Sequence, residues 1–133
     1  MIFLDSNIFI KYFQGKEEHY SEKLEVFFNN IVGGKIISFI NSMVIAEIIW
    51  VLDRVYSWNK DEICDNIDFI LNTPNIKIKE RNILAEAIKI FRKNNIDFID
   101  SYNYAYIKNL KSNQIYSYDK DFEKLSDIQR LDP

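Results

Sequence analysis

The chain has 133 residues, a length that fits one compact domain with a sizeable core and excludes two ordinary domains. Its residues are 47% hydrophobic, 28% charged and 15% aromatic, and the presence of only three Gly and two Pro argues against a loop-rich or barrel architecture. The net charge of −3 does not indicate a dedicated nucleic-acid binder. It does not exclude one, because acidic metal sites lower the total while lysines elsewhere can contact phosphate.

Several features predict a soluble, cytoplasmic protein with no membrane attachment. No stretch approaches the ~20 apolar residues of a membrane span, and no signal-peptide core follows the apolar start MIFL. The single Cys64 cannot form an internal disulfide, which fits a reducing compartment. The single histidine, His19, has charged neighbours and no Cys or second His nearby, so we expect it in solvent rather than in a zinc site.

Strand-like and helix-like segments alternate along the chain. In chain order we predict a strand at 1–4, helices at 6–14 and 17–32, a strand at 35–40, a helix at 43–56 capped by Asn41 or Ser42, a helix at 61–72, a strand at 76–80, a helix at 82–95, the segment 96–99, a helix from Asp100 to about Lys111, a strand at 114–118, a helical turn at 119–125 and an edge strand at 128–131.

This alternation predicts an α/β fold, a three-layer α/β/α sandwich with a central, mainly parallel sheet. No internal repeat, low-complexity tract or linker argues for a second domain, so we expect a single domain over residues 1–133. In such sheets, ligands bind outside the carboxyl ends of the strands. Any functional side chains are therefore expected at that edge.

Four acidic residues occupy unusual positions. Asp5 ends the first strand, Glu47 lies inside the apolar run MVIAEIIWVL, Asp100 opens a helix, and Asp119 ends the strand-like IYSY. Each stands at the same expected edge of the sheet or on a helix that can cross it. If the four carboxylates meet, their repulsion and desolvation are costly unless a cation lies between them. A divalent metal site is the natural prediction.

Glu47 is the most informative of the four by itself. Its helical neighbours at three and four positions are Met43, Val44, Trp50 and Val51, so its face of the helix is wholly apolar. A buried carboxylate there would have to raise its pKa or find a partner. We favour a site residue over a structurally paired glutamate.

The three aspartates have simpler alternatives. Asp5 can merely cap the helix that follows it, and Asp100 has the same ambiguity, with Asp97 one turn earlier. Asp119 and Asp121 lie at a strand-to-turn junction, where Asp is a frequent turn former. We expect Asp121 to be the better cap and Asp119 the better ligand. The arrangement of the acids together is more informative than any single one.

With LDSNIFI, the glutamate of MVIAEIIWVL, IDFIDSYNYAY and IYSYDKDF in this order, the chain resembles the PIN-domain family, most of all its VapC-type ribonuclease toxins, over nearly its whole length. The resemblance implies that Asp5, Glu47, Asp100 and Asp119 are the catalytic residues and bind one or two Mg²⁺ or Mn²⁺ ions. Hard cations of this kind prefer oxygen ligands.

The resemblance also implies residues that support the ligands or position the substrate. They are Asn7, Ser117, Asp97 and Asp121. Ser101 stands where the family usually has Ala, and Ser117 replaces the commoner Thr. Which carboxylate of each pair, Asp97 or Asp100 and Asp119 or Asp121, binds metal stays open.

The function implied is a metal-dependent endoribonuclease, the toxin component of a type II toxin–antitoxin system. Its implied partners are an RNA substrate, a cognate antitoxin and a second copy of the chain. One alternative is a catalytically silent PIN-like module that binds RNA or protein, although the intact acids argue against it. A phosphatase of the haloacid dehalogenase type is disfavoured, because residues 5–9 do not match its D-x-D-x-[TV] motif.

Overall fold

The structure, a computed structural model, describes residues 1–15 and 18–133. For residues 18–20 it describes the backbone alone, so the expectation that the side chain of His19 is in solvent falls outside the described residues. The chain divides into two compact units, residues 1–81 and residues 82–133. The single-domain organisation stays a prediction.

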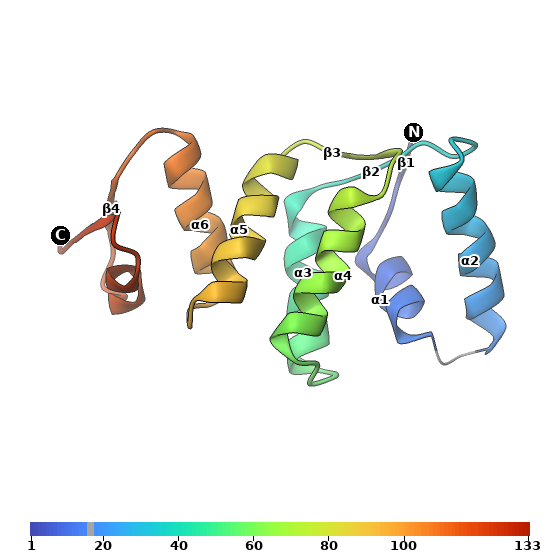
Figure 1. Cartoon of the computed structure of the whole chain (residues 1–133), viewed down its shortest axis with the longest axis horizontal. Helices are drawn as coiled ribbons and strands as arrows, with labels where there is room; N and C mark the ends of the chain where they lie inside the picture. The colour runs from blue at the N-terminus through green and yellow to red at the C-terminus, as the bar shows by residue number, and fades with distance from the viewer. Residues whose placement is uncertain (16–17) are drawn as a thin grey trace. The chain divides into compact units, whose positions relative to one another are not determined.

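The first unit is built on a three-stranded parallel sheet with the strand order β1-β2-β3 (Figure 1). Ile2 and Phe3 of β1 pair with Ser38 and Phe39 of β2, and β2 continues the pairing with β3. The elements of this unit are β1 (Ile2–Phe3), α1 (Ser6–Gln14), α2 (Glu18–Val32), β2 (Ser38–Ile40), α3 (Ser42–Arg54), α4 (Lys60–Asn72) and β3 (Ile76–Ile78).

Helix α3 carries much of the core of this unit. Its sequence SMVIAEIIWVLDR is apolar on most sides, and the side that is buried consists of Val44, Ile45, Ile48, Ile49 and Leu52. The helix contacts α1 and α4. Its amino-terminal cap is the Asn41 carboxamide, which accepts a hydrogen bond from the backbone N–H of Val44 at 3.1 Å. Asn41 is one of the two residues that we predicted as the cap.

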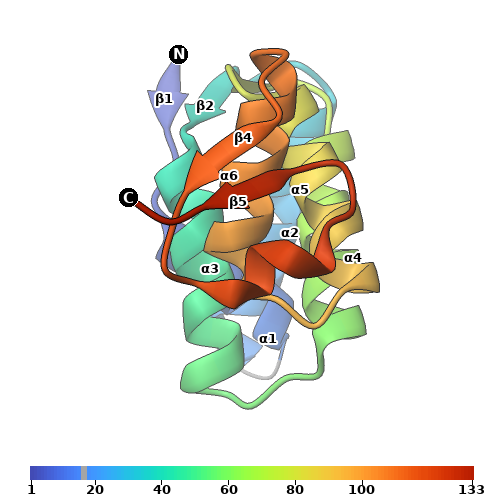
Figure 2. The same cartoon turned by 90° about the vertical axis from the view of Figure 1, so that its left-hand side faces the viewer.

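The second unit contains two helices and a two-stranded parallel sheet (Figure 2). Its elements are α5 (Arg81–Lys93), α6 (Phe98–Asn109), β4 (Gln114–Tyr116), the 3₁₀ helix η1 (Lys120–Lys124) and β5 (Gln129–Leu131). Parallel strands β4 and β5 are joined through η1, a short connection in place of the usual crossover helix.

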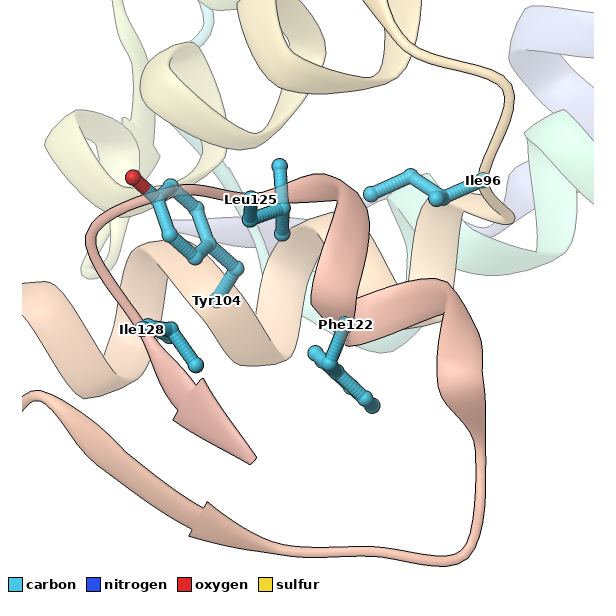
Figure 3. Close-up of a cluster of buried hydrophobic side chains, with 5 residues drawn as sticks. All are labelled: Ile96, Tyr104, Phe122, Leu125 and Ile128. Atoms are coloured by element: carbon cyan, nitrogen blue, oxygen red, sulfur yellow. The ribbon is translucent and has the colours of Figure 1, made fainter. Parts of the chain in front are cut away.

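A small hydrophobic cluster holds η1 and the chain after it against α6 (Figure 3). Its members are Ile96, Tyr104, Phe122, Leu125 and Ile128, all buried. The Tyr104 hydroxyl donates a hydrogen bond to the Asp127 carboxylate, which also accepts from Lys108 Nζ at 2.7 Å. Burial and the neighbouring Asp127 raise the pKa of Tyr104 to about 12. The segment that carries Asp119 is thus fixed to the helix that carries Asp100.

The predicted α/β class with parallel strands is confirmed. Among the described residues the strands form two sheets, one in each unit. The predicted start of the helix at Asp100 was wrong, because α6 already begins at Phe98. Across residues 1–15 and 18–133, no helix has both the length and the apolar character that crossing a membrane demands.

Candidate metal centre

Three carboxylates come together in the second unit. Asp100 projects from the first turn of α6, Asp119 precedes η1 and Asp121 lies within it. Each offers one carboxylate oxygen, and these three oxygens lie within 4.8 Å of one another. Asp100 and Asp121 are partly buried and Asp119 is exposed. This is the one acidic group of its kind among the described residues.

The local structure of α6 explains how Asp100 reaches this group. Asp97 is the N-cap residue, with extended backbone, and its side chain makes no capping hydrogen bond. Asp100 therefore stands inside the helix, three residues after the cap. A carboxylate in the first turn is favoured by the helix dipole. The alternative that Asp100 is itself a helix cap was wrong.

The turn after β4 fixes the other two carboxylates through a chain of hydrogen bonds. The Ser117 hydroxyl accepts from the backbone N–H of Asp119 at 3.0 Å, and Asp119 Oδ1 accepts from the backbone N–H of Asp121 at 2.8 Å. Asp119 is thus the cap of η1, whereas we expected Asp121 to be the better cap. The expectation was wrong because η1 begins at Lys120, so the residue that precedes it is Asp119.

Two basic side chains adjoin this turn. Lys124 Nζ lies 2.8 Å from Asp121 Oδ1 and donates to the backbone carbonyl of Asn95 at 2.8 Å. Arg130 Nη1 donates to the backbone carbonyl of Ser117 at 2.6 Å. Neither was among the predicted site residues, because nothing in their sequence spacing marks a contact with this turn.

The charges in the group repel one another. Burial raises the pKa of Asp100, and the negative charges of Asp119, Asp97 and Asp121 raise it further, in that order. A cation between the carboxylates would remove this penalty. The donors are all carboxylate oxygens and are partly open to solvent, a set that fits a hard divalent cation such as Mg²⁺ or Mn²⁺.

Asp5 lies in the first unit, directly after β1 at the carboxyl edge of the parallel sheet. It is the N-cap residue of α1, yet its side chain makes no capping hydrogen bond, so capping does not account for its carboxylate. Asp5 and Asn7, in the first turn of α1, are both exposed.

The same edge carries a carboxylate that we did not predict. Glu80 follows β3 as Asp5 follows β1, and the Ser42 hydroxyl donates a hydrogen bond to it. Asn41, Ser42, Lys79 and Glu80 line a cavity of about 290 Å³. The run IKIKE could have predicted Glu80 as a site residue, because it is strand-like and ends in an acid. We missed it because a charged residue at the end of a strand is common in ordinary turns.

Glu47 lies on α3 as predicted, but it is exposed rather than buried. Its neighbours Met43 and Trp50 are also exposed, at 73% and 60%. The reason is that α3 is apolar almost all round while its core contacts are made by the opposite side of the helix. Burial of a lone carboxylate is therefore not the argument for Glu47, and its role in a metal site stays a prediction.

Comparisons with known proteins support one family. A family model described as "PIN domain" matches residues 2–128. A protein named VapC ribonuclease from Aquifex aeolicus (strain VF5) is 28% identical over 127 residues, which cover 94% of this chain and 92% of that protein. The crystal structure of Mycobacterium tuberculosis VapC20, described as a sarcin–ricin loop cleaving toxin, aligns with a TM-score of 0.41 and 12% identity over 96% of this chain and 97% of that one.

Proposed function

Because this chain belongs to the PIN domain family, we propose that it is a metal-dependent endoribonuclease and the toxin of a type II toxin–antitoxin pair. The observation that carries the proposal is the group formed by Asp100, Asp119 and Asp121, whose oxygens lie within 4.8 Å of one another. The similarity to the VapC ribonuclease of Aquifex aeolicus over nearly the full length of both chains supports a nuclease.

The proposed ligands of the cation are Asp5, Glu47, Asp100 and Asp119, with Asp121 as a further candidate because it joins the acidic group. Bound there, Mg²⁺ or Mn²⁺ would activate water for in-line attack on a phosphodiester and neutralise charge on the phosphate. The acids hold the cation and, without it, would repel the RNA backbone. Asn7, Ser117 and Asp97 are proposed to support the ligands or position the RNA.

The hydrogen bonds in the turn give Ser117 and Asp119 separate tasks. The Ser117 hydroxyl fixes the backbone of Asp119, and Asp119 Oδ1 fixes that of Asp121. Oδ1 of Asp119 therefore accepts a backbone hydrogen bond, while the same carboxylate lies beside that of Asp100 in the acidic group that we propose binds the cation. The proposed partners follow from the same role: single-stranded RNA as substrate, an antitoxin that covers the acids, and a second copy of the chain in a cytoplasmic homodimer.

The proposal is tested by incubating purified protein with single-stranded RNA and Mg²⁺ or Mn²⁺. We expect cleavage that EDTA abolishes and that Asp5→Asn, Glu47→Gln and Asp100→Asn each reduce by about 100-fold or more, as loss of a group that acts on the transition state does. Glu22→Gln, an exposed acid on α2, is the matched control and should cleave like wild type. Cleavage that is equal in all variants would refute the assignment.

A second measurement separates a ribonuclease from a silent RNA-binding module. The ribonuclease should bind Mn²⁺, and its expression should arrest cell growth in a manner that Asp5→Asn abolishes. A silent module would bind RNA without cleavage and would leave growth unchanged in both forms. Intact RNA together with harmless expression of the wild type would favour that alternative.

A further inference from the structure

Arg130 makes an unusual set of contacts for a residue of a short edge strand. It lies in β5, and its side chain is only 11% exposed. Its guanidinium donates to the backbone carbonyl of Ser117 at 2.6 Å, to Glu123 Oε1 at 2.9 Å and to the Asp132 carboxylate. A largely covered cation needs such partners, and the planar fork of arginine is suited to contact several at once.

Two of these partners bracket the turn that carries the acids. Ser117 comes two residues before Asp119, and Glu123 comes two residues after Asp121. The hydrogen bonds then continue from the Ser117 hydroxyl to the backbone of Asp119, and from the Asp119 carboxylate to the backbone of Asp121. A continuous series of contacts therefore leads from the Arg130 guanidinium to the Asp119 carboxylate and to the backbone of Asp121.

The turn needs such an anchor because its carboxylates repel each other and Asp100. With their oxygens within 4.8 Å, they would move apart unless the backbone on both sides were held. The hydrophobic cluster holds the segment through Phe122 and Leu125. On the other side of the acids, Ser117 is held by its backbone N–H, which donates to the Leu131 carbonyl at 3.1 Å, and by Arg130.

We propose that Arg130 is a positioning residue that holds Asp119 and Asp121 in the arrangement that binds a divalent cation. This inference rests on the proposed function, since it assumes that the acids bind a metal. The change in Mn²⁺ affinity that it predicts for loss of Arg130 is opposite in sign to the change that simple electrostatics predicts. A positive charge near the acids opposes cation binding, so its removal would strengthen binding if charge alone mattered, whereas loss of positioning weakens it.

The test is titration of the full chain with Mn²⁺. The concentration of free Mn²⁺ is measured at each step from its electron paramagnetic resonance signal. We compare wild type with Arg130→Gln, which removes charge and fork, and with Arg130→Lys, which retains charge alone. Lys89→Gln, an exposed cation on α5, is the control for charge. Each variant is measured at 10 °C after circular dichroism has shown that it is folded.

We expect both Arg130 variants to bind Mn²⁺ about tenfold more weakly than wild type, the scale of loss seen when groups that orient metal ligands are removed. Lys89→Gln should bind like wild type. Unchanged or tighter binding by the folded Arg130 variants overturns this inference and leaves the proposed function standing. Failure of the wild type to bind Mn²⁺ overturns both.

If the Arg130 variants do not fold, a variant of one of its partners still tests the proposal. Glu123→Gln removes one anchor of the guanidinium and leaves Arg130 in place. It also removes a negative charge, so its matched control is Glu86→Gln, an exposed acid on α5. Weaker Mn²⁺ binding by Glu123→Gln than by Glu86→Gln supports positioning, and equal binding by the two overturns it.

Discussion

Replacement of Asp100 by asparagine should stabilise the metal-free protein. The carboxylate of Asp100 is partly buried and lies in one group with those of Asp119 and Asp121. Its pKa is raised by burial and by these neighbouring charges, so its ionised form is disfavoured in the folded state. Asparagine removes the charge at nearly the same size. The folded, metal-free chain then loses the two repulsive pairs within this group, and it also loses the repulsion between Asp100 and Asp97.

The size of the effect follows from the separation of the oxygens. Two unit charges at 4.8 Å repel by about 1 kcal/mol in a water-like dielectric and by about 3.5 kcal/mol at an effective dielectric constant of 20. Because Asp119 is exposed and the other two are only partly buried, we adopt the lower figure. Two pairs give about 1 to 2 kcal/mol, or a rise in Tm of about 3 to 8 °C for a chain of this length.

The assay is thermal unfolding in EDTA and in Mn²⁺, at pH 7 and low ionic strength. In EDTA, Asp100→Asn should melt above wild type. In Mn²⁺ at 100 times its Kd, wild type should gain about 2.7 kcal/mol by ligand binding, whereas the variant that lacks a ligand gains little. The order of the two proteins is therefore reversed by metal. Glu22→Gln, which removes an exposed charge from α2, should follow wild type in both buffers.

The pH dependence gives an independent check with a definite sign. The pKa of Asp100 is raised above its ordinary value of 3.8, so the folded state binds the proton more tightly than the unfolded state does. Its protonation stabilises the fold at low pH, and this stabilisation is lost as pH rises through the interval between the two values. The advantage of Asp100→Asn should thus appear above that interval and vanish below it.

Two results would refute this reasoning in different ways. If Asp100→Asn melts at or below wild type in EDTA, the three carboxylates do not repel one another in the folded protein. If the variant melts higher in EDTA but still gains as much from Mn²⁺ as wild type, the repulsion is present and Asp100 is not a ligand. The second result would mean that Mn²⁺ binds without Asp100 and would favour Asp119 and Asp121 as its ligands.

Further predictions concern stability. Tyr104→Phe should cost about 1 to 2 kcal/mol by leaving Asp127 without this hydrogen bond. Because the pKa of Tyr104 is raised from 10.0 to about 12, its stabilisation is complete below pH 10.0 and is lost toward pH 12, which ultraviolet titration of the phenol can follow. Asn41→Ala removes the cap bond to Val44 and should cost about 1 kcal/mol in urea unfolding. Leu52→Ala, in the core, should cost about 2 to 5 kcal/mol in the same assay, and a loss below 1 kcal/mol would contradict its complete burial.

The order of elements was predictable because each has a local cause. Helix α3 begins where Asn41 offers a cap, and α2 ends where Gly34 adopts the left-handed conformation at φ +79° that glycine accepts readily. The start of α6 was missed because IDFI has the apolar, branched composition of a strand. Contacts of Phe98 with the rest of the fold outweigh that local preference, and burial of Phe98 shows it.

The candidate site was only partly predictable for a different reason. The sequence contains the acids of a PIN domain in order, but it does not specify which oxygen each side chain uses. The cap of η1 is Asp119 rather than the expected Asp121, because η1 begins at Lys120, two residues before the start that a cap at Asp121 would give. The exposure of Glu47 was missed because an apolar neighbourhood along a helix does not say which of its apolar sides enters the core.

The second unit joins its stability to its proposed activity. Its small cluster of Tyr104, Phe122, Leu125 and neighbours holds the acid-bearing turn against α6, so burial of apolar surface opposes the repulsion of the carboxylates. A cation that relieves this repulsion would therefore stabilise the whole unit, and the stability of the fold would rise with the concentration of metal. If the proposed site binds a cation, a turn that is held by packing and by the contact of Arg130 with Ser117 would keep its acids together before that cation binds. The repulsion between the carboxylates lowers the stability of the metal-free protein, and substitution of a single acid should restore that stability.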